Sequence, residues 1–280
     1  MIIAIFPNAL KKNTLETARK ILDYLHARHV TVVAEEEVAK QIGAKPLTSV
    51  KPNEVNFLIS LGGDGTILRL VHRHPELTAP VLAINMGNLG FLADIALEDL
   101  IPSLQNLLDR KYTVKARLVI EGKIADGNHN FAVNEIVVHR SRNPSLVDLA
   151  IWVDDNYLNT FSADGIIIAT PSGSTAYSLA AGGPIVTPEI HALILTPICP
   201  HTISNRPIVL MPKHNLRVEN TSSEEPLEIT YDGFPTAFIG LHESVTVSLS
   251  SRDFPLVTMP DHDYYATLRN KLGWAGKVRA

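Results

Sequence analysis

The chain has 280 residues, of which 45% are hydrophobic and 19% are charged, and its formal net charge is −4. This length accommodates one large domain or two of ordinary size, and the lack of a basic surplus argues against broad nucleic-acid binding. The single cysteine, Cys199, excludes an intramolecular disulfide and a cysteine-rich zinc site.

The N-terminal part of the chain alternates short apolar runs with helical patterns. Its first residues lack the basic and apolar regions of a signal peptide, and no apolar run reaches the roughly 20 residues of a membrane helix. We therefore expect a cytoplasmic location and no membrane partner. Residues 2–6 and 30–33 are predicted strands, separated by a helix that begins at 13–14, and 35–37 indicate a solvated helix start. This order predicts a parallel sheet with helical crossovers.

The uncharged run 55–61 leads into Gly62-Gly63-Asp64-Gly65-Thr66 and then into an aliphatic helical pattern. The run predicts a strand that is buried on both faces. Glycines allow a ligand close to the backbone, and amides at a helix start bind phosphate well. One carboxylate among such amides indicates phosphoryl transfer to a hydroxyl group. The alternative is an ordinary strand-to-helix turn that Asp64 caps.

Two features follow this turn. His72 and His74 could be metal ligands, but their position before Pro75 favours surface residues at a helix end. A predicted strand over 80–84 leads into a turn over 85–92, in which Phe91 either stacks on a planar ligand or packs in the core. The core interpretation is favoured, because an aromatic residue between aliphatic residues is usually packing. Residues 98–110 predict an amphipathic helix.

From residue 112 onward the predicted strands are short and β-branched, and turn residues separate them. They cover 114–120, 131–139, 146–152, 158–161, 166–169, 209–211, 216–219, 227–231, 236–239 and 245–249. Many short strands at this spacing predict a second, antiparallel β domain. Residues 264–272 predict a final helix that Gly273 stops.

Two polar interruptions of this β region are candidate binding sites. Asn134 and Glu135 follow an apolar run, where buried polar groups need partners. They either bind the hydroxyl and amino groups of a nucleoside or form a turn at a strand end. Asp164-Gly165 precedes a strand and the polar loop 170–178, which carries more hydroxyl groups than an N-cap requires. That density favours a ligand such as ribose or an anion.

The Gly-Gly-Asp-Gly-Thr turn, the Asn134-Glu135 pair, Asp164 and the loop 170–177, in this order, resemble the NAD kinase family. The turn alone is shared with diacylglycerol kinases, sphingosine kinases and phosphofructokinases, whereas the pair and the loop are far more specific. The likeness covers about 55–250 and includes 85–92 and 197–207. It implies a Rossmann-like α/β domain with a parallel sheet over 1–111, completed by 255–280, and a β-sandwich domain over 112–254.

The resemblance also implies an activity and its residues. Such a transferase moves the γ-phosphoryl group of ATP, with Mg²⁺, to the 2′-hydroxyl of the adenosine ribose of NAD, which gives NADP. Asp64 would accept the proton of that hydroxyl as the catalytic residue, and no protein metal cage is implied. The phosphate-binding residues would be Gly62, Gly63, Gly65 and Thr66. The NAD-binding residues would be Asp64, Gly65, Phe91, Asn134, Glu135, Asp164, Thr175, Ala176, Tyr177, Ser178, Leu179 and Ala180.

The sequence departs from the family pattern at two positions. Ser162-Ala163 stands where many members carry arginine or a further glycine, and Phe234 stands where many bacterial members carry glutamine. No role transfers to Ser162 or Phe234. The resemblance further implies a homodimer or homotetramer. It leaves open ATP or polyphosphate as donor, NAD or NADH as acceptor, and feedback by the product.

Two other functions compete with this interpretation. A lipid or sphingoid-base kinase shares the glycine-rich turn but needs an apolar acceptor channel. A non-catalytic sensor would bind NAD or NADP without transferring phosphate. A Rossmann dehydrogenase is disfavoured, because no G-x-G-x-x-G follows the first strand. A P-loop NTPase is excluded, because the chain lacks G-x-x-x-x-G-K-[ST].

Overall fold

A computed structural model describes residues 1–87, 89–125, 127–141, 145–202, 204–222 and 224–274. The chain forms two compact units. The first unit comprises Met1–Ala116 and the chain from Pro255 onward, and the second comprises Arg117–Phe254. Among the described residues, no helix is long and apolar enough to cross a membrane.

The first unit is built on a sheet with the strand order β3-β2-β1-β4-β5-β19-β6, in which the strands from β3 to β19 pair in parallel. Its strands are β1 (Ile2–Pro7), β2 (Thr31–Ala34), β3 (Lys45–Pro46), β4 (Phe57–Gly62), β5 (Val81–Asn85), β6 (Thr113–Arg117) and β19 (Phe254–Thr258). Its helices are α1 (Thr14–His26), α2 (Glu36–Ile42), α3 (Asp64–Arg73), α4 (Leu100–Leu108) and α6 (Tyr264–Leu272). The predicted β-α-β order of this part is therefore confirmed.

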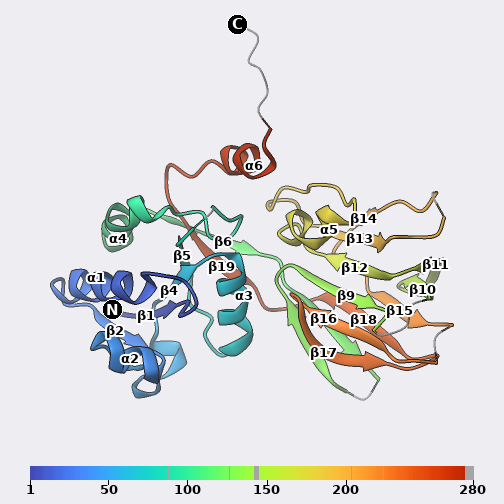
Figure 1. The fold of residues 1–280 in the computed structure, drawn as a ribbon, viewed down its shortest axis with the longest axis horizontal. Helices are drawn as coiled ribbons and strands as arrows, with labels where there is room; N and C mark the ends of the chain where they lie inside the picture. The colour runs from blue at the N-terminus through green and yellow to red at the C-terminus, as the bar shows by residue number, and fades with distance from the viewer. Residues whose placement is uncertain (88, 126, 142–144, 203, 223, 275–280) are drawn as a thin grey trace, which may run out of the picture. The chain divides into compact units, whose positions relative to one another are not determined.

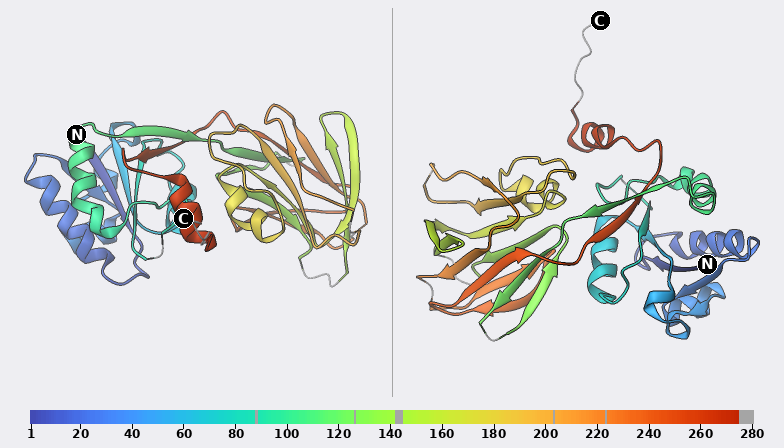
Figure 2. Two further views of the ribbon diagram at one scale, coloured as in Figure 1. Left: turned by 90° about the horizontal axis from the view of Figure 1, so that it is seen from above. Right: turned by 180° about the vertical axis from the view of Figure 1, so that it is seen from behind.

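Helices α1, α2 and α4 pack on one face of this sheet and form one core with it. Strand β4 is buried along its whole length, as its uncharged sequence predicts. α1 and α4 lie side by side (Figures 1 and 2), and the Tyr24 hydroxyl donates a hydrogen bond of 2.7 Å to Gln105 Oε1 between them. The strand β4, which carries the glycine-rich turn at its end, is therefore held in a packed core of sheet and helices.

The second unit is an antiparallel β-sandwich. Its strands are β7 (Ile120–Ile124), β8 (His129–Ala132), β9 (Glu135–His139), β10 (Val147–Val153), β11 (Asn156–Ala163), β12 (Gly165–Ala169), β13 (Leu193–Ile198), β14 (Ile208–Leu210), β15 (Leu216–Asn220), β16 (Leu227–Tyr231), β17 (Phe234–Ile239) and β18 (Ser244–Leu249). One sheet has the order β11-β10-β15-β18-β7-β8, and the other has β14-β13-β12-β9-β16-β17, visible from top to bottom in Figure 1. Alternate residues of both sheets form a shared core.

Two strand predictions differ from the structure in ways that affect the domains. The run 114–120 does not open the β domain: β6 belongs to the sheet of the first unit, so the first unit extends to Ala116 instead of ending at 111. The run 131–139 is not one strand but β8 and β9, which belong to different sheets. The chain therefore crosses from one sheet to the other at 133–134.

Candidate functional site

The glycine-rich turn joins β4 directly to α3, which begins at Asp64. A Cβ atom at Gly62 would collide with the side chain of Thr66, so this position requires glycine. The Thr66 hydroxyl accepts hydrogen bonds from Asn8 Nδ2 at 3.1 Å and from the Gly63 amide at 3.4 Å. These hydrogen bonds hold the turn in place. Gly63 and Gly65 have no Cβ atoms that would shield the backbone from a ligand.

The carboxylate of Asp64 is engaged by the loop that follows β5. Oδ2 accepts a hydrogen bond from the Phe91 amide at 2.9 Å, and Oδ1 accepts from the amides of Leu92 at 3.1 Å and Ala93 at 2.8 Å. A Cβ atom at Gly90 would collide with this carboxylate. An ionised carboxylate has about four acceptor positions, so three are occupied and one remains on Oδ2.

Phe91 lies on this loop, and it is half-buried instead of packed in the core. Its ring centroid is 6.4 Å from that of Tyr264 in α6, and Lys271 Nζ lies 5.7 Å from the ring centroid. The loop is also tied to Asn85, whose Oδ1 accepts from the Gly87 amide at 2.7 Å. The core interpretation of Phe91 is therefore wrong, and the ring is partly open to a ligand.

Lys11 is a residue near the turn that the sequence did not single out. Its Nζ lies 3.5 Å from the point that a Gly63 Cβ would occupy and 3.4 Å from the corresponding point at Gly87. The side chain is half-buried, and its ammonium group forms no hydrogen bond or ion pair with any described residue. Lys11 therefore places an uncompensated positive charge over the glycine-rich turn. The one sequence signal was the Lys11-Lys12 pair that follows the first strand.

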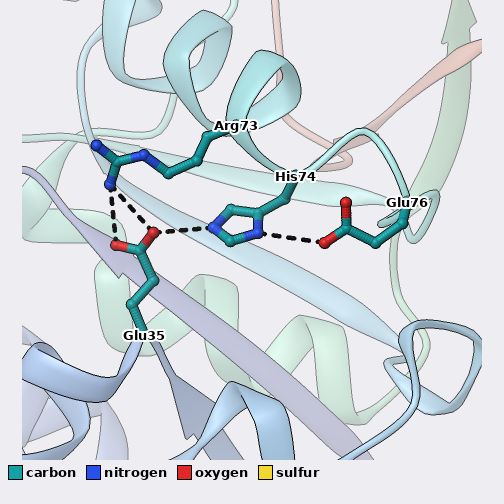
Figure 3. Close-up of polar contacts among 4 residues, drawn as sticks. All are labelled: Glu35, Arg73, His74 and Glu76. Atoms are coloured by element: carbon teal, nitrogen blue, oxygen red, sulfur yellow. Dashed lines mark hydrogen bonds and ion pairs between the residues drawn. The ribbon is translucent and has the colours of Figure 1, made fainter.

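Of the two histidines, His72 lies within α3, and His74 forms a polar cluster with Glu35, Arg73 and Glu76 (Figure 3). His74 ends α3, and its Nε2 lies 2.8 Å from Glu35 Oε1 while its Nδ1 lies 3.3 Å from Glu76 Oε1. Arg73 completes the cluster with an ion pair of 3.1 Å to Glu35. Within the described residues, no three His, Cys, Asp or Glu side chains come together as metal ligands.

In the second unit, Asn134 and Glu135 lie where the chain leaves β8 and begins β9. Asp232 fixes this crossing, because its carboxylate accepts from the amides of Val133 at 2.9 Å, Asn134 at 2.7 Å and Glu135 at 3.2 Å. The sequence alone predicts no role for Asp232. Asp232 and Gly233 form the two-residue turn between β16 and β17. The φ angle of Asp232 is 52°, a left-handed conformation that is usual in Asp-Gly hairpin turns.

The side chains of Asn134 and Glu135 are 8% and 7% exposed. Asn134 Oδ1 and Glu135 Oε2 are buried without a hydrogen-bond partner among the described residues. Burial, together with the charge of Asp232, raises the pKa of Glu135 to about 8, although the Tyr177 amide acts in the opposite direction. Unsatisfied buried oxygens are costly, and a ligand that donates hydrogen bonds to both atoms would offset this cost. The structure shows the pair as a strand-end turn with two oxygens available to such donors.

A cavity of about 260 Å³ opens beside Glu135. Asp164 and Arg140 line it, joined by an ion pair of 2.9 Å between Arg140 Nε and Asp164 Oδ1. Tyr177, at the start of α5 (Tyr177–Ala180), contributes an aromatic ring that is 46% exposed. The cavity therefore combines carboxylates, one guanidinium group and an open aromatic face.

The hydroxyl groups of the loop 170–178 mostly hold the loop together. Ser174 donates to the Pro171 carbonyl at 2.6 Å, and Thr175 donates to the Ser172 carbonyl at 3.0 Å. The hydroxyl of Ser178 lies 2.9 Å from that of Thr196. The loop also lies tightly against the start of β9, because a Cβ atom at Gly173 would collide with the carbonyl of residue 134. The dense hydroxyl groups that favoured a ligand in the sequence thus have structural partners.

The predicted residues fall into two groups. The turn residues Gly62, Gly63, Asp64, Gly65 and Thr66 lie together with Phe91 in the first unit. Asn134, Glu135, Asp164 and 175–180 belong to the second unit, where Glu135, Asp164 and Tyr177 line one cavity. Ala176 and Leu179 are half-buried and Ala180 is exposed. The sequence departs from the family pattern at Ser162 and Phe234. The Ser162 hydroxyl donates a hydrogen bond to Asp148 Oδ1, and Phe234 is the first residue of β17.

Comparison with known proteins places this geometry in a family. The models of the ATP-NAD kinase N-terminal and C-terminal domains match residues 3–112 and 133–259. The NAD kinase of Protochlamydia amoebophila is 55% identical over 277 residues, which cover 99% of each chain. The chain belongs to the NAD kinase family. The NAD kinase of Caldanaerobacter subterraneus is 36% identical and aligns with 96% of this chain and 98% of its own.

Two solved structures of the NAD kinase family share the fold. A yeast NADH kinase complexed with NADH has a TM-score of 0.88 at 28% identity, covering 100% of this chain and 89% of its own. An NAD kinase from Archaeoglobus fulgidus in complex with ATP has a TM-score of 0.74 at 25% identity, covering 98% and 99%. The predicted fold, a parallel-sheet α/β domain followed by a β-sandwich, is therefore confirmed.

Proposed function

We propose that this chain transfers the γ-phosphoryl group of ATP to the 2′-hydroxyl of the adenosine ribose of NAD and so makes NADP. Membership of the NAD kinase family supports this reaction. So do the relatives solved with NADH and with ATP, which have the same fold. The observation that carries the proposal within this chain is the one acceptor position left on Asp64 Oδ2.

Asp64 acts on the attacking hydroxyl in this proposal. Oδ2 accepts the hydrogen bond of the 2′-hydroxyl, orients its oxygen and takes up the proton as the bond to phosphorus forms. Phosphoryl transfer depends mainly on positioning and charge compensation, and a carboxylate is a weak base toward a sugar hydroxyl. Three amide hydrogen bonds fix the direction of this carboxylate. Orientation is therefore the larger part of its role.

The backbone of the turn binds the phosphates of the donor. The amides of Gly63 and Gly65 and the N-terminus of α3 offer hydrogen-bond donors and a positive partial charge. Mg²⁺, which such a donor carries, offsets negative charge on the phosphates. Phosphate oxygens and water would hold the ion, because among the described residues no three His, Cys, Asp or Glu side chains come together as metal ligands.

The dinucleotide is held by the second unit. Asn134 Oδ1 and Glu135 Oε2 gain donors from ribose hydroxyl or adenine amino groups, which satisfies both buried oxygens. Asp164 and Tyr177 hold the other end of NAD at the cavity, with the backbone of 175–180 beside them. Phe91 lies against the bound NAD in the first unit.

One assay tests the proposal directly. Purified protein is incubated with Mg²⁺, NAD and either ATP or polyphosphate, and NADP is measured. We expect NADP to form with ATP. Donor consumption that depends on a lipid instead of NAD would support a lipid kinase, and NAD binding without NADP formation would support a sensor. The proposal includes a homodimer or homotetramer and a cytoplasmic location, which light scattering and cell fractionation test.

A further inference from the structure

A second cavity, of about 570 Å³, lies within the first unit at the carboxyl ends of β1 and β2. Its walls are formed by 6–10 after β1, 35–38 after β2, and the side of α3 that carries Thr66, Arg69 and Leu70. In the sheet, β1 lies between β2 and β4, so the order in which the strands are added reverses direction at β1. Crevices at such a reversal of strand order are the usual ligand sites of parallel sheets, and this volume is typical of them.

The walls of this cavity differ in chemistry from one end to the other. Phe6 and Leu70 are buried and Val38 is half-buried, so they form an apolar wall. Glu36 and Glu37, in the first turn of α2, add carboxylates at one rim. An apolar wall beside hydrogen-bond acceptors suits a base and its ribose, because the base stacks and the ribose hydroxyls donate.

The cluster shown in Figure 3 makes one wall rigid. Burial alone would raise the pKa of Glu35, but hydrogen bonds from His74 and Arg73 outweigh it and hold the pKa below its usual value. Glu35 therefore stays ionised and paired at neutral pH. Arg69, by contrast, is exposed and forms no hydrogen bond or ion pair with a described residue.

The cavity reaches the glycine-rich turn at Thr66. Thr66 lines the cavity, and its hydroxyl is bonded to both Asn8 and the Gly63 amide. The segment after β1 continues from the cavity at Leu10 to Lys11, whose ammonium group lies over Gly63. A ligand that starts in the cavity and ends at the turn thus passes from a carboxylate rim to a positive charge.

We propose that this cavity binds the nucleoside of a nucleoside triphosphate donor, whose phosphates pass Lys11 to reach the glycine-rich turn. The charge gradient sets the direction, because carboxylates repel phosphates and accept hydrogen bonds from ribose, whereas Lys11 and Arg69 attract phosphates. Inorganic polyphosphate has no group that fits the apolar wall. The inference rests on the proposed function and adds a donor preference to it.

Filling the cavity tests the inference. Ala9 is exposed and lines the cavity, so Ala9→Trp places a large ring in it without removing a buried contact. Ala27→Trp is the matched control, because Ala27 is equally exposed but lies at the end of α1. We expect Ala9→Trp to raise the KM for ATP at least tenfold. The KM for NAD and the inhibition constant of inorganic tripolyphosphate stay within twofold of those of the control.

Two results would overturn the inference while leaving the proposed function intact. One is an unchanged KM for ATP in Ala9→Trp. The other is an equal rise in the KM for ATP and in the inhibition constant of tripolyphosphate, because the ring would then obstruct phosphates. If neither the parent nor Ala27→Trp makes NADP, the proposed function fails, and binding of ATP to the parent and to Ala9→Trp still measures the cavity.

Lys11 is tested separately. Lys11→Ala weakens both ATP and tripolyphosphate about tenfold, because its ammonium group lies on the phosphate path. Lys12→Ala is the matched control, since Lys12 is exposed and does not line the cavity. Equal affinities of the Lys11→Ala and Lys12→Ala variants for tripolyphosphate would remove Lys11 from that path.

Discussion

Replacement of Asp64 by asparagine changes two properties of the site together. The new amide side chain would keep one oxygen, which can still accept from the Leu92 and Ala93 amides. Its amino group would face the Phe91 amide, where Oδ2 now accepts at 2.9 Å. One charge-assisted hydrogen bond is lost and two donors face each other, which costs about 1.5–3 kcal/mol. The loop that carries Phe91 is therefore loosened, and the acceptor of the hydroxyl proton is lost.

These two effects have different kinetic signatures. Loss of the proton acceptor lowers kcat by roughly 10²–10⁴-fold. Loosening of the loop weakens NAD binding about tenfold or more, since 1.4 kcal/mol is a factor of ten. Steady-state kinetics gives kcat, and calorimetry gives the affinity for NAD. Thermal unfolding of each variant shows whether the fold persists.

Asn85→Ala is the control that separates them. Asn85 holds the same loop through the Gly87 amide at 2.7 Å and the Ala93 carbonyl at 3.0 Å, but it offers no carboxylate. We expect both variants to lose NAD affinity and only Asp64→Asn to lose kcat a hundredfold. An equal loss of kcat in both variants would mean that Asp64 acts through the loop alone, and a parental kcat in Asp64→Asn would refute the catalytic role.

Two further predictions concern the second unit. Tyr177→Ala weakens NAD binding by ~1–3 kcal/mol, because a stacking ring is lost. Tyr157→Ala removes another exposed tyrosine and leaves the affinity for NAD, measured by calorimetry, unchanged. Equal affinities of the two variants would contradict this prediction. The pKa of Glu135 is raised from 4.5 to about 8 in the folded chain, so ionisation destabilises the fold progressively from pH 4.5 to 8. Glu135→Gln removes this ionisation. The free energy of unfolding of the variant minus that of the parent should therefore rise by roughly 3–5 kcal/mol between pH 5 and pH 8. Urea unfolding that shows a pH-independent difference would refute it.

The sequence predicts features that depend on neighbouring residues. The uncharged run 55–61 and the glycines after it determine β4 and its turn locally, and both are found where expected. The break between β8 and β9 was missed, because the apolar pattern continues across Asn134 while the chain changes sheets. Lys11 and Asp232 were missed for a related reason: each acts on residues far along the chain, and only the folded sheets bring them there.

The position of β19 has a consequence for how the chain is made. This strand lies between β5 and β6, yet it is the last strand to be synthesised. On the ribosome, the first sheet lacks the strand between β5 and β6 until residues 254–258 emerge, whereas the second unit has all its described strands once β18 is complete. The inserted β-sandwich can therefore fold first, and the split α/β sheet closes around its last strand afterwards. A chain that ends before residue 254 would expose the edges of β5 and β6 to aggregation.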